Sequence, residues 1–164
     1  MLGLFTACLL FGCGGGNQES SSEDQSTESA TETESSSGTP AVTPVDNPEA
    51  KSESKGVGRF SSTEIGPLDK GMAQKGEAIF TTKCASCHKL TEEKLVGPGL
   101  KGVTERRTPE WILNMITNPD QMTKEDPVAK ALFEKHLIQM TFQNVSDDEA
   151  RQILEFLRQN DGSK

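Results

Sequence analysis

The chain has 164 residues, with 25 acidic and 17 basic side chains and a formal net charge of −8. This length allows one or at most two small domains and excludes a large multi-domain enzyme. The charge is unevenly distributed, because residues 14–55 contain nine acids and two bases, whereas residues 56–164 contain 16 acids and 15 bases. The nearly neutral second part has no basic stripe of the kind that binds nucleic acid.

The N-terminal residues have the features of an export signal. Residues 2–11 form a mostly apolar run, which is too short to span a membrane as a helix because a span needs about 20 residues. The run ends in Leu-Phe-Gly-Cys at residues 10–13, which resembles the lipobox of bacterial lipoproteins, although no Lys or Arg precedes it. The resemblance implies that residues 1–12 are a cleaved signal peptide and that Cys13 carries lipid. A generic signal peptide with an incidental cysteine is the alternative.

Residues 13–55 are predicted to be a disordered, acidic tether. Residues 14–55 are rich in Ser, Thr and Glu, contain five apolar side chains and have no aromatic residue. So little apolar surface cannot offset the entropy lost on ordering, and repulsion among the acids favours an extended chain. With lipid on Cys13, this segment would be a leash of about forty residues with a reach on the order of 35 Å. Residues 56–164 are then the folded domain.

The pentapeptide Cys84-Ala85-Ser86-Cys87-His88 is the most informative part of the sequence. Cys-x-x-Cys-His is the attachment motif of a c-type haem. Two thiols on one helical turn can each bond one vinyl group of the porphyrin, and His88 then supplies the proximal imidazole to the iron. We therefore expect one haem c, bound covalently through Cys84 and Cys87.

Three other functions of this pentapeptide are disfavoured. A zinc site would need a second pair of ligands, and the only later histidine or cysteine is His136. A thioredoxin-like dithiol would follow a strand, whereas the flanking segments have helical patterns. A disulfide across two residues would be strained.

The hydrophobic pattern predicts an all-α domain of about four helices with long loops, since no segment has sustained period-2 alternation. The first helix spans residues 68–83 and places Met72, Gly76, Ile79 and Phe80 on one face.

The later helices are predicted from their N-terminal signals. Thr108-Pro109 and Asp126-Pro127 each combine an N-cap with a proline at the first helical position, and the predicted helices end at Thr117 and Leu137. A capping box at residues 146–149 opens the last helix, whose apolar stripe consists of Ala150, Ile153, Leu154 and Leu157.

Residues 68–159 resemble a class I mono-haem cytochrome c. Besides the haem motif, Gly76 and Phe80 match the glycine and aromatic residue at which the family's first helix closely crosses its last. Residues 96–102 are similar to the family's Gly-Pro-x-Leu loop, which implies that the carbonyl of Pro98 accepts a hydrogen bond from the proximal histidine. The implied fold wraps its helices around one covalently bound haem.

The resemblance also implies a methionine as the second iron ligand. Met140 lies in a loop just before the last helix, where the family places this ligand, although Thr141 replaces the proline that commonly follows. Met122, which is expected in a loop after Asn118-Pro119, and His136 are the alternatives. The two methionines expected in the core are Met72 and Met115.

Arg106, Arg107 and Trp111 are candidate partners of the haem propionates. Partly buried carboxylates need hydrogen-bond donors, and an arginine offers two in parallel. A solvated pair of arginines and a core tryptophan would be the alternative.

An iron ligated by His88 and Met140 has no open position for a substrate, so we expect an electron-transfer protein and not an enzyme. The expected partners are a quinol-oxidising complex as donor and a terminal oxidase or an anaerobic reductase as acceptor. The lysines that could form a docking surface, or could simply be solvated, are Lys83, Lys89, Lys94 and Lys101. We expect a monomer, exported and lipid-anchored on the periplasmic or outer side of a bacterial membrane, where c-type haem is attached.

Two other functions would use the same haem. A labile sixth ligand would make the domain a gas sensor or a peroxide-handling site, for which only His136 could serve as a distal base. Alternatively, the domain would be the electron-entry module of a larger reductase or oxidase complex.

Overall fold

The computed structural model describes residues 45–163, and all the regular structure in this range is helical. The predicted signal peptide, Cys13 and most of the predicted tether lie outside the described residues. Within residues 45–163, no helix is long and apolar enough to cross a membrane. The helices are α1 (Lys70–Lys83), α2 (Val103–Arg106), α3 (Pro109–Thr117), α4 (Pro119–Glu125), α5 (Pro127–His136) and α6 (Asp147–Asn160). The prediction of an all-α domain is confirmed.

Three helices begin at the predicted N-caps. The side chain of Thr108 accepts a hydrogen bond from the backbone N–H of Trp111, and Asp126 does the same for Ala129. At α6, Ser146 and Glu149 form the reciprocal pair of hydrogen bonds that defines a capping box. Because each cap satisfies N–H groups that have no partner within the helix, it fixes where the helix starts.

The described residues contain six helices instead of about four, because two short helices were not predicted. Helix α2 has four residues and follows Gly102, whose φ of 70° lies in the left-handed region. Helix α4 has seven residues and begins directly after Asn118. Neither is long enough to show a repeating apolar pattern that would identify it as a helix from the sequence.

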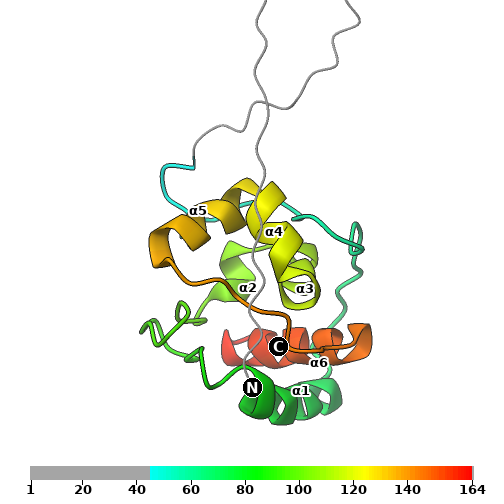
Figure 1. Ribbon diagram of the computed structural model, residues 1–164. Coiled ribbons are helices and arrows are strands. Elements are labelled where there is room, and N and C mark those ends of the chain that lie inside the picture. The colour runs from blue at the N-terminus through cyan, green and yellow to red at the C-terminus, as the bar shows by residue number, and fades with distance from the viewer. Residues whose placement is uncertain (1–44, 164) are drawn as a thin grey trace, which may run out of the picture. The chain divides into compact units, whose positions relative to one another are not determined.

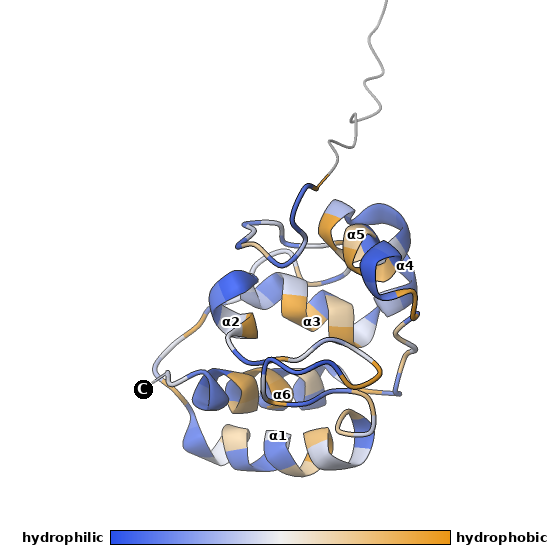
Figure 2. Ribbon diagram, turned by 90° about the vertical axis from the view of Figure 1, so that its left-hand side faces the viewer, coloured by the Kyte–Doolittle hydropathy of each residue, from blue (hydrophilic) through white to orange (hydrophobic). Residues whose placement is uncertain are grey.

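Helix α6 lies between α1 and α3, as Figures 1 and 2 show from two directions. The crossing of α1 and α6 is close at Gly76, where a Cβ would overlap the backbone carbonyl group of Gln152. Phe80 of α1 packs against Phe156 of α6, with ring centroids 5.4 Å apart. Gly76 and Phe80 therefore lie at a close crossing of α1 and α6, as the resemblance implied, and the crossing requires a residue without a side chain at position 76.

The ordered domain begins earlier than the predicted boundary at Gly56. Residues 47–57, here called the strap, lie along the domain surface. The backbone N–H of Ser52 donates to the carbonyl oxygen of Arg106 at 3.0 Å, and the Ser54 hydroxyl donates to Asp126 Oδ2 at 2.6 Å. The N–H of Val57 donates to Met122 Sδ at 3.0 Å. The predicted tether, residues 13–55, therefore includes residues that pack against the domain.

Arg107 explains why so polar a segment packs here. Its guanidinium group is buried, and it donates hydrogen bonds to the carbonyl oxygens of Pro48 and Ala50. It also lies over the Trp111 ring, with 5.2 Å between Cζ and the ring centroid. A buried cation needs acceptors, and the strap supplies them from its backbone, which the composition of the segment does not reveal.

We expect Gly76→Ala to lower the free energy of unfolding by about 1–3 kcal/mol, because the added methyl group forces α1 away from α6. Gly71→Ala in the same helix is the control, since its Cβ would meet only the Asp69 side chain, at 3.3 Å, and alanine favours a helix by up to about 1 kcal/mol. Urea unfolding of the haem-loaded protein measures both. Equal stability of the two variants would contradict the steric explanation.

Candidate haem site

The haem motif begins where α1 ends. Cys84 is the C-cap of α1, and its N–H donates to the carbonyl oxygen of Phe80 at 2.8 Å. The N–H groups of Cys87 and His88 both donate to the carbonyl oxygen of Cys84, each at 3.0 Å. This turn brings two free thiols to one cavity, with Cys84 half-buried and Cys87 exposed.

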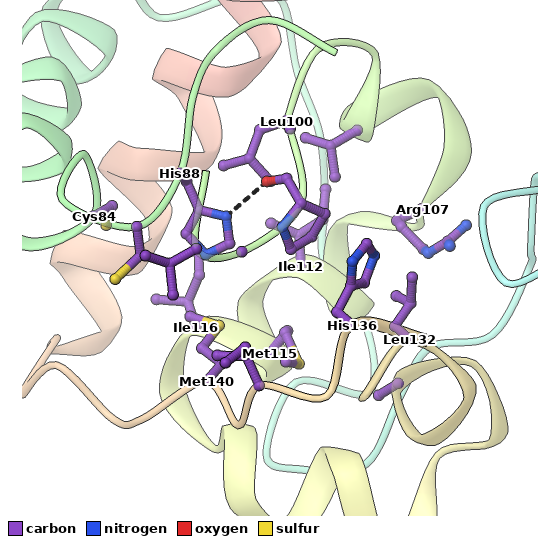
Figure 3. A pocket seen from close by; sticks show the side chains of 18 of the residues that line it. Cys84, His88, Leu100, Arg107, Ile112, Met115, Ile116, Leu132, His136 and Met140 are labelled. Carbon is purple, nitrogen blue, oxygen red and sulfur yellow. Dashed lines mark hydrogen bonds between the residues drawn. The ribbon is translucent and has the colours of Figure 1, made fainter. Parts of the chain in front are cut away.

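The imidazole of His88 is held by the loop that follows it. Its Nδ1 lies 2.9 Å from the carbonyl oxygen of Pro98, as Figure 3 shows. A carbonyl oxygen only accepts hydrogen bonds, so Nδ1 carries the proton and the lone pair is on Nε2. A side chain at Gly97 would collide with the ring, since its Cβ would lie 2.5 Å from His88 Cε1. The geometry therefore leaves Nε2 free to ligate a metal.

Burial affects the ionisation of two groups in this motif. It lowers the pKa of His88, partly opposed by the hydrogen bond to Pro98, so the ring is held in the neutral form that can ligate a metal. Burial also raises the pKa of the Cys84 thiol to about 11, partly opposed by the charge of Lys83. Cys84 is therefore a protonated thiol at neutral pH.

The cavity beside His88 has mostly apolar walls. Residues from α1, α2, α3, α4, α5 and α6 line it, so it occupies the centre of the fold. Its apolar lining includes Phe80, Leu100, Val103, Ile112, Met115, Ile116, Leu132, Ile153 and Leu157. The seven site residues predicted for the cofactor all line this one cavity; they are Cys84, Cys87, His88, Pro98, Arg106, Trp111 and Met140.

The methionines differ in whether they line this cavity. Met140 lines it from the loop after α5, and Met115 lines it from α3; both lie across the pocket from His88 in Figure 3. Met115 is half-buried and was expected in the core without access to a cofactor. Met122 was expected in a loop, but it lies on α4, is fully buried and does not line the cavity. Its sulfur instead accepts the hydrogen bond from the strap.

A polar cluster at the edge of the cavity was not predicted. His136 lines the cavity, and its Nε2 lies 3.2 Å from Oε1 of Glu49 in the strap. Lys135 Nζ lies 3.1 Å from the same oxygen. Burial by itself raises the pKa of Glu49, but the hydrogen bonds and charges of Lys135 and His136 outweigh it, and the pKa is lowered. Sequence reasoning missed Glu49 because it falls in a segment with the composition of a tether.

The candidate propionate partners already have hydrogen-bond acceptors within the protein. Trp111 Nε1 donates to Asp126 Oδ1 at 2.9 Å, and Arg106 Nη1 donates to the carbonyl oxygen of Lys101 at 2.6 Å. Arg107 donates to the strap. Trp111 therefore contributes the ring to the cavity wall, and its N–H is directed to Asp126.

The four lysines considered for docking do not form a free cationic surface. Lys83 pairs with Glu149 at 3.0 Å, Lys89 with Glu93 at 2.7 Å, and Lys101 with Glu92 at 3.7 Å. Lys94 Nζ lies 3.5 Å from the carbonyl oxygen of His136. The neighbouring acids thus neutralise most of this charge.

The comparison with protein families decides what the site is. Residues 73–161 match the family model described as Cytochrome c. The chain belongs to the cytochrome c family. It has the class I, mono-haem form of that fold, as the resemblance of residues 68–159 implied.

Individual relatives agree with this assignment. A cytochrome c from Rhodothermus marinus is 40% identical, with a TM-score of 0.61, over 63% of this chain and 90% of that chain. An engineered form of that cytochrome is 39% identical, with the same TM-score and coverage. A Cytochrome c-553-like protein of Synechocystis sp. (strain ATCC 27184 / PCC 6803 / Kazusa) is 39% identical over 49 residues, which are 30% of this chain and 47% of the relative. This chain spans about half the length of that curated relative.

The residues of the cavity fit the haem c of this family. Cys84 and Cys87 supply two free thiols on one turn, and His88 supplies a neutral imidazole whose Nε2 is unprotonated. The apolar walls suit a porphyrin, which needs protection from water. Haem c, covalently bound at the Cys-x-x-Cys-His motif, is the cofactor of this domain.

We expect the contribution of Glu49 to stability to depend on pH. Its pKa is lower in the folded protein than the ordinary glutamate value, so its carboxylate stabilises the fold above that value, and the effect is lost as the pH falls through the folded-state pKa. Glu49→Gln should therefore destabilise the protein at pH 7, by about 1 kcal/mol or less for so accessible a pair, and have a smaller effect at pH 3.

Urea unfolding of the haem-loaded protein at both pH values measures this difference. Glu53→Gln is the matched control in the strap, because Glu53 pairs only with Lys51 and both side chains are exposed. A loss of stability with Glu49→Gln that was the same at pH 3 and pH 7 would contradict the role of the carboxylate charge.

Proposed function

We propose that this protein is a membrane-tethered electron carrier that moves single electrons between components of a respiratory chain, with His88 and Met140 as the axial ligands of its haem. The observation that carries the proposal is the position of Met140. It lines the cavity across from His88, whereas Met122 is fully buried and does not line the cavity. When bound, haem c supplies an iron that exchanges one electron.

In the proposed site, the chain itself would supply both ligands of the iron. His88 is fixed by Pro98, and a thioether from Met140 would complete the ligand set and favour the ferrous state. With both positions filled by its own side chains, the protein would transfer electrons without binding a substrate at the iron.

Lipid on Cys13 would confine the carrier to a membrane surface and raise the effective concentration of membrane-bound partners. We infer an exported monomer on the periplasmic or outer side of a bacterial membrane. Its donor would be a quinol-oxidising complex and its acceptor a terminal oxidase or an anaerobic reductase. Because Val45 and the strap pack on the domain, the part of the chain that can act as a leash ends before Val45.

The visible spectrum of the haem-loaded protein tests the ligand assignment. Ferric haem with a methionine ligand has a weak sulfur-to-iron band at long wavelength. We expect this band in the unaltered protein and in Met115→Ala and Met122→Ala, and its loss in Met140→Ala. The three variants are matched because each removes one thioether.

Persistence of the band in Met140→Ala together with its loss in Met115→Ala would assign the ligand to α3 and overturn the proposal. Absence of the band from the unaltered protein, with ready binding of carbon monoxide by the ferrous form, would favour a gas sensor or a peroxide-handling site.

A second experiment tests the tether. Cys13→Ser should abolish the incorporation of labelled fatty acid into the haem protein without changing its spectrum, because the change removes the lipid attachment site. The measurement is the labelled palmitate in the purified protein after expression in a bacterium that processes lipoproteins, with Cys8→Ser as the control. Labelling of the Cys13→Ser variant equal to that of the unaltered protein would refute the lipid anchor.

A further inference from the structure

The loop that carries Met140 has few connections to the rest of the domain. It joins α5 to α6, and within the described part of the chain no backbone–backbone hydrogen bond involves residues 138–145. Its two ends have left-handed backbone conformations at residues other than glycine, with φ of 57° at Leu137 and 52° at Asn144. Such conformations are uncommon for residues with a side chain, so side-chain contacts must hold the loop in place.

One side chain connects the peptide of Met140 directly to the helical framework. Gln139 Nε2 donates to the carbonyl oxygen of Met140 at 3.0 Å. On its other side, Gln139 Oε1 lies 3.1 Å from the hydroxyl of Thr123, which is buried on α4. The amide nitrogen also lies 3.5 Å from Asp120 Oδ1 on the same helix. The Gln139 amide therefore bridges α4 and the backbone of the candidate ligand.

The orientation of the Gln139 side-chain amide, which decides where its nitrogen and its oxygen lie, follows from the hydrogen-bond partners of the two atoms. The carbonyl oxygen of Met140 can only accept, so the atom facing it must be the nitrogen of Gln139. The oxygen then faces Thr123, whose hydroxyl proton is shared between Gln139 Oε1 and the carbonyl oxygen of Pro119 at 3.0 Å. The opposite orientation of the amide would place two acceptors against each other.

We propose that Gln139 is a positioning residue for the distal haem ligand, holding the backbone of Met140 so that its thioether competes effectively with outside ligands for the iron. The inference rests on the proposed role of Met140. If the thioether must be held in place, weakening this bridge populates arrangements in which the sixth position is open, and an added ligand then binds with a higher apparent affinity.

Exogenous imidazole is the probe, titrated into the ferric, haem-loaded full chain and followed in the visible spectrum. Gln139→Ala should raise the apparent affinity for imidazole on the order of fivefold, the effect of losing one ordinary hydrogen bond, and should weaken the sulfur-to-iron band. Gln139→Glu is the second variant, because it keeps the shape of the side chain but removes both N–H donors. It should change the affinity in the same direction.

Gln143→Ala is the matched control. Gln143 lies on the same loop and, like Gln139, lines the cavity. Within the described part of the chain, its Nε2 donates to the carbonyl and hydroxyl oxygens of Thr141, at 3.1 and 2.9 Å, and to no atom of α4. It therefore connects the loop to itself and not to α4. The affinity for imidazole should stay within about twofold of that of the unaltered protein, since the bridge to α4 remains.

A double-mutant cycle separates positioning from a general change in the pocket. In the Met140→Ala background no thioether competes, so adding Gln139→Ala should leave the imidazole affinity unchanged. An equal increase in both backgrounds would show that Gln139 acts on the pocket itself and would overturn the inference, as would no increase in the otherwise unaltered protein. Absence of the sulfur-to-iron band from the unaltered protein would instead refute the proposed ligation.

Discussion

The close crossing of α1 over α6 is the constraint on which the rest of the domain depends. At Gly76 the two backbones approach so closely that no side chain fits between α1 and Gln152. The crossing places the C-terminal end of α1 at the cavity to which Ile153 and Leu157 of α6 contribute. Because Cys84 caps that end of α1, the position of one helix relative to another determines where the attachment thiols lie.

The two sides of the haem cavity are built by different means. On the proximal side, backbone hydrogen bonds join the segment after His88 to itself, from Gly97 to Cys87 at 2.9 Å and from Leu100 to Lys89 at 2.9 Å. The Pro98 carbonyl then orients the imidazole. On the distal side, side chains hold a loop in which residues 138–145 make no backbone–backbone hydrogen bond within the described range 45–163. The candidate proximal ligand His88 is thus held by the main chain, and the candidate distal ligand Met140 by side-chain contacts.

Much of this arrangement could be predicted from the sequence, and the omissions have physical reasons. Helices α3, α5 and α6 were predictable from their N-terminal caps, and α6 also from its apolar stripe. The packing of the strap could not be predicted, because the strap is attached through backbone carbonyls that accept hydrogen bonds from the buried Arg107. Every residue has such a carbonyl, so the amino-acid composition does not reveal the attachment. The location of Met122 was missed for a related reason. Asn118-Pro119 indicates a turn, and a helix of seven residues is too short to show its buried face.

The two sides of the cavity differ in how readily a substitution could change the binding of the sixth ligand. With Met140 as the proposed sixth ligand, a change among the side chains that hold the distal loop would alter the competition for that position, while the backbone bonds that orient His88 and the turn that carries the thiols would stay in place. The proximal side has no equivalent freedom, because Gly97 is in contact with the imidazole and admits no side chain. On the proposed ligation, ligand strength would therefore be set from the distal side, at residues such as Gln139 that lie away from the attachment motif.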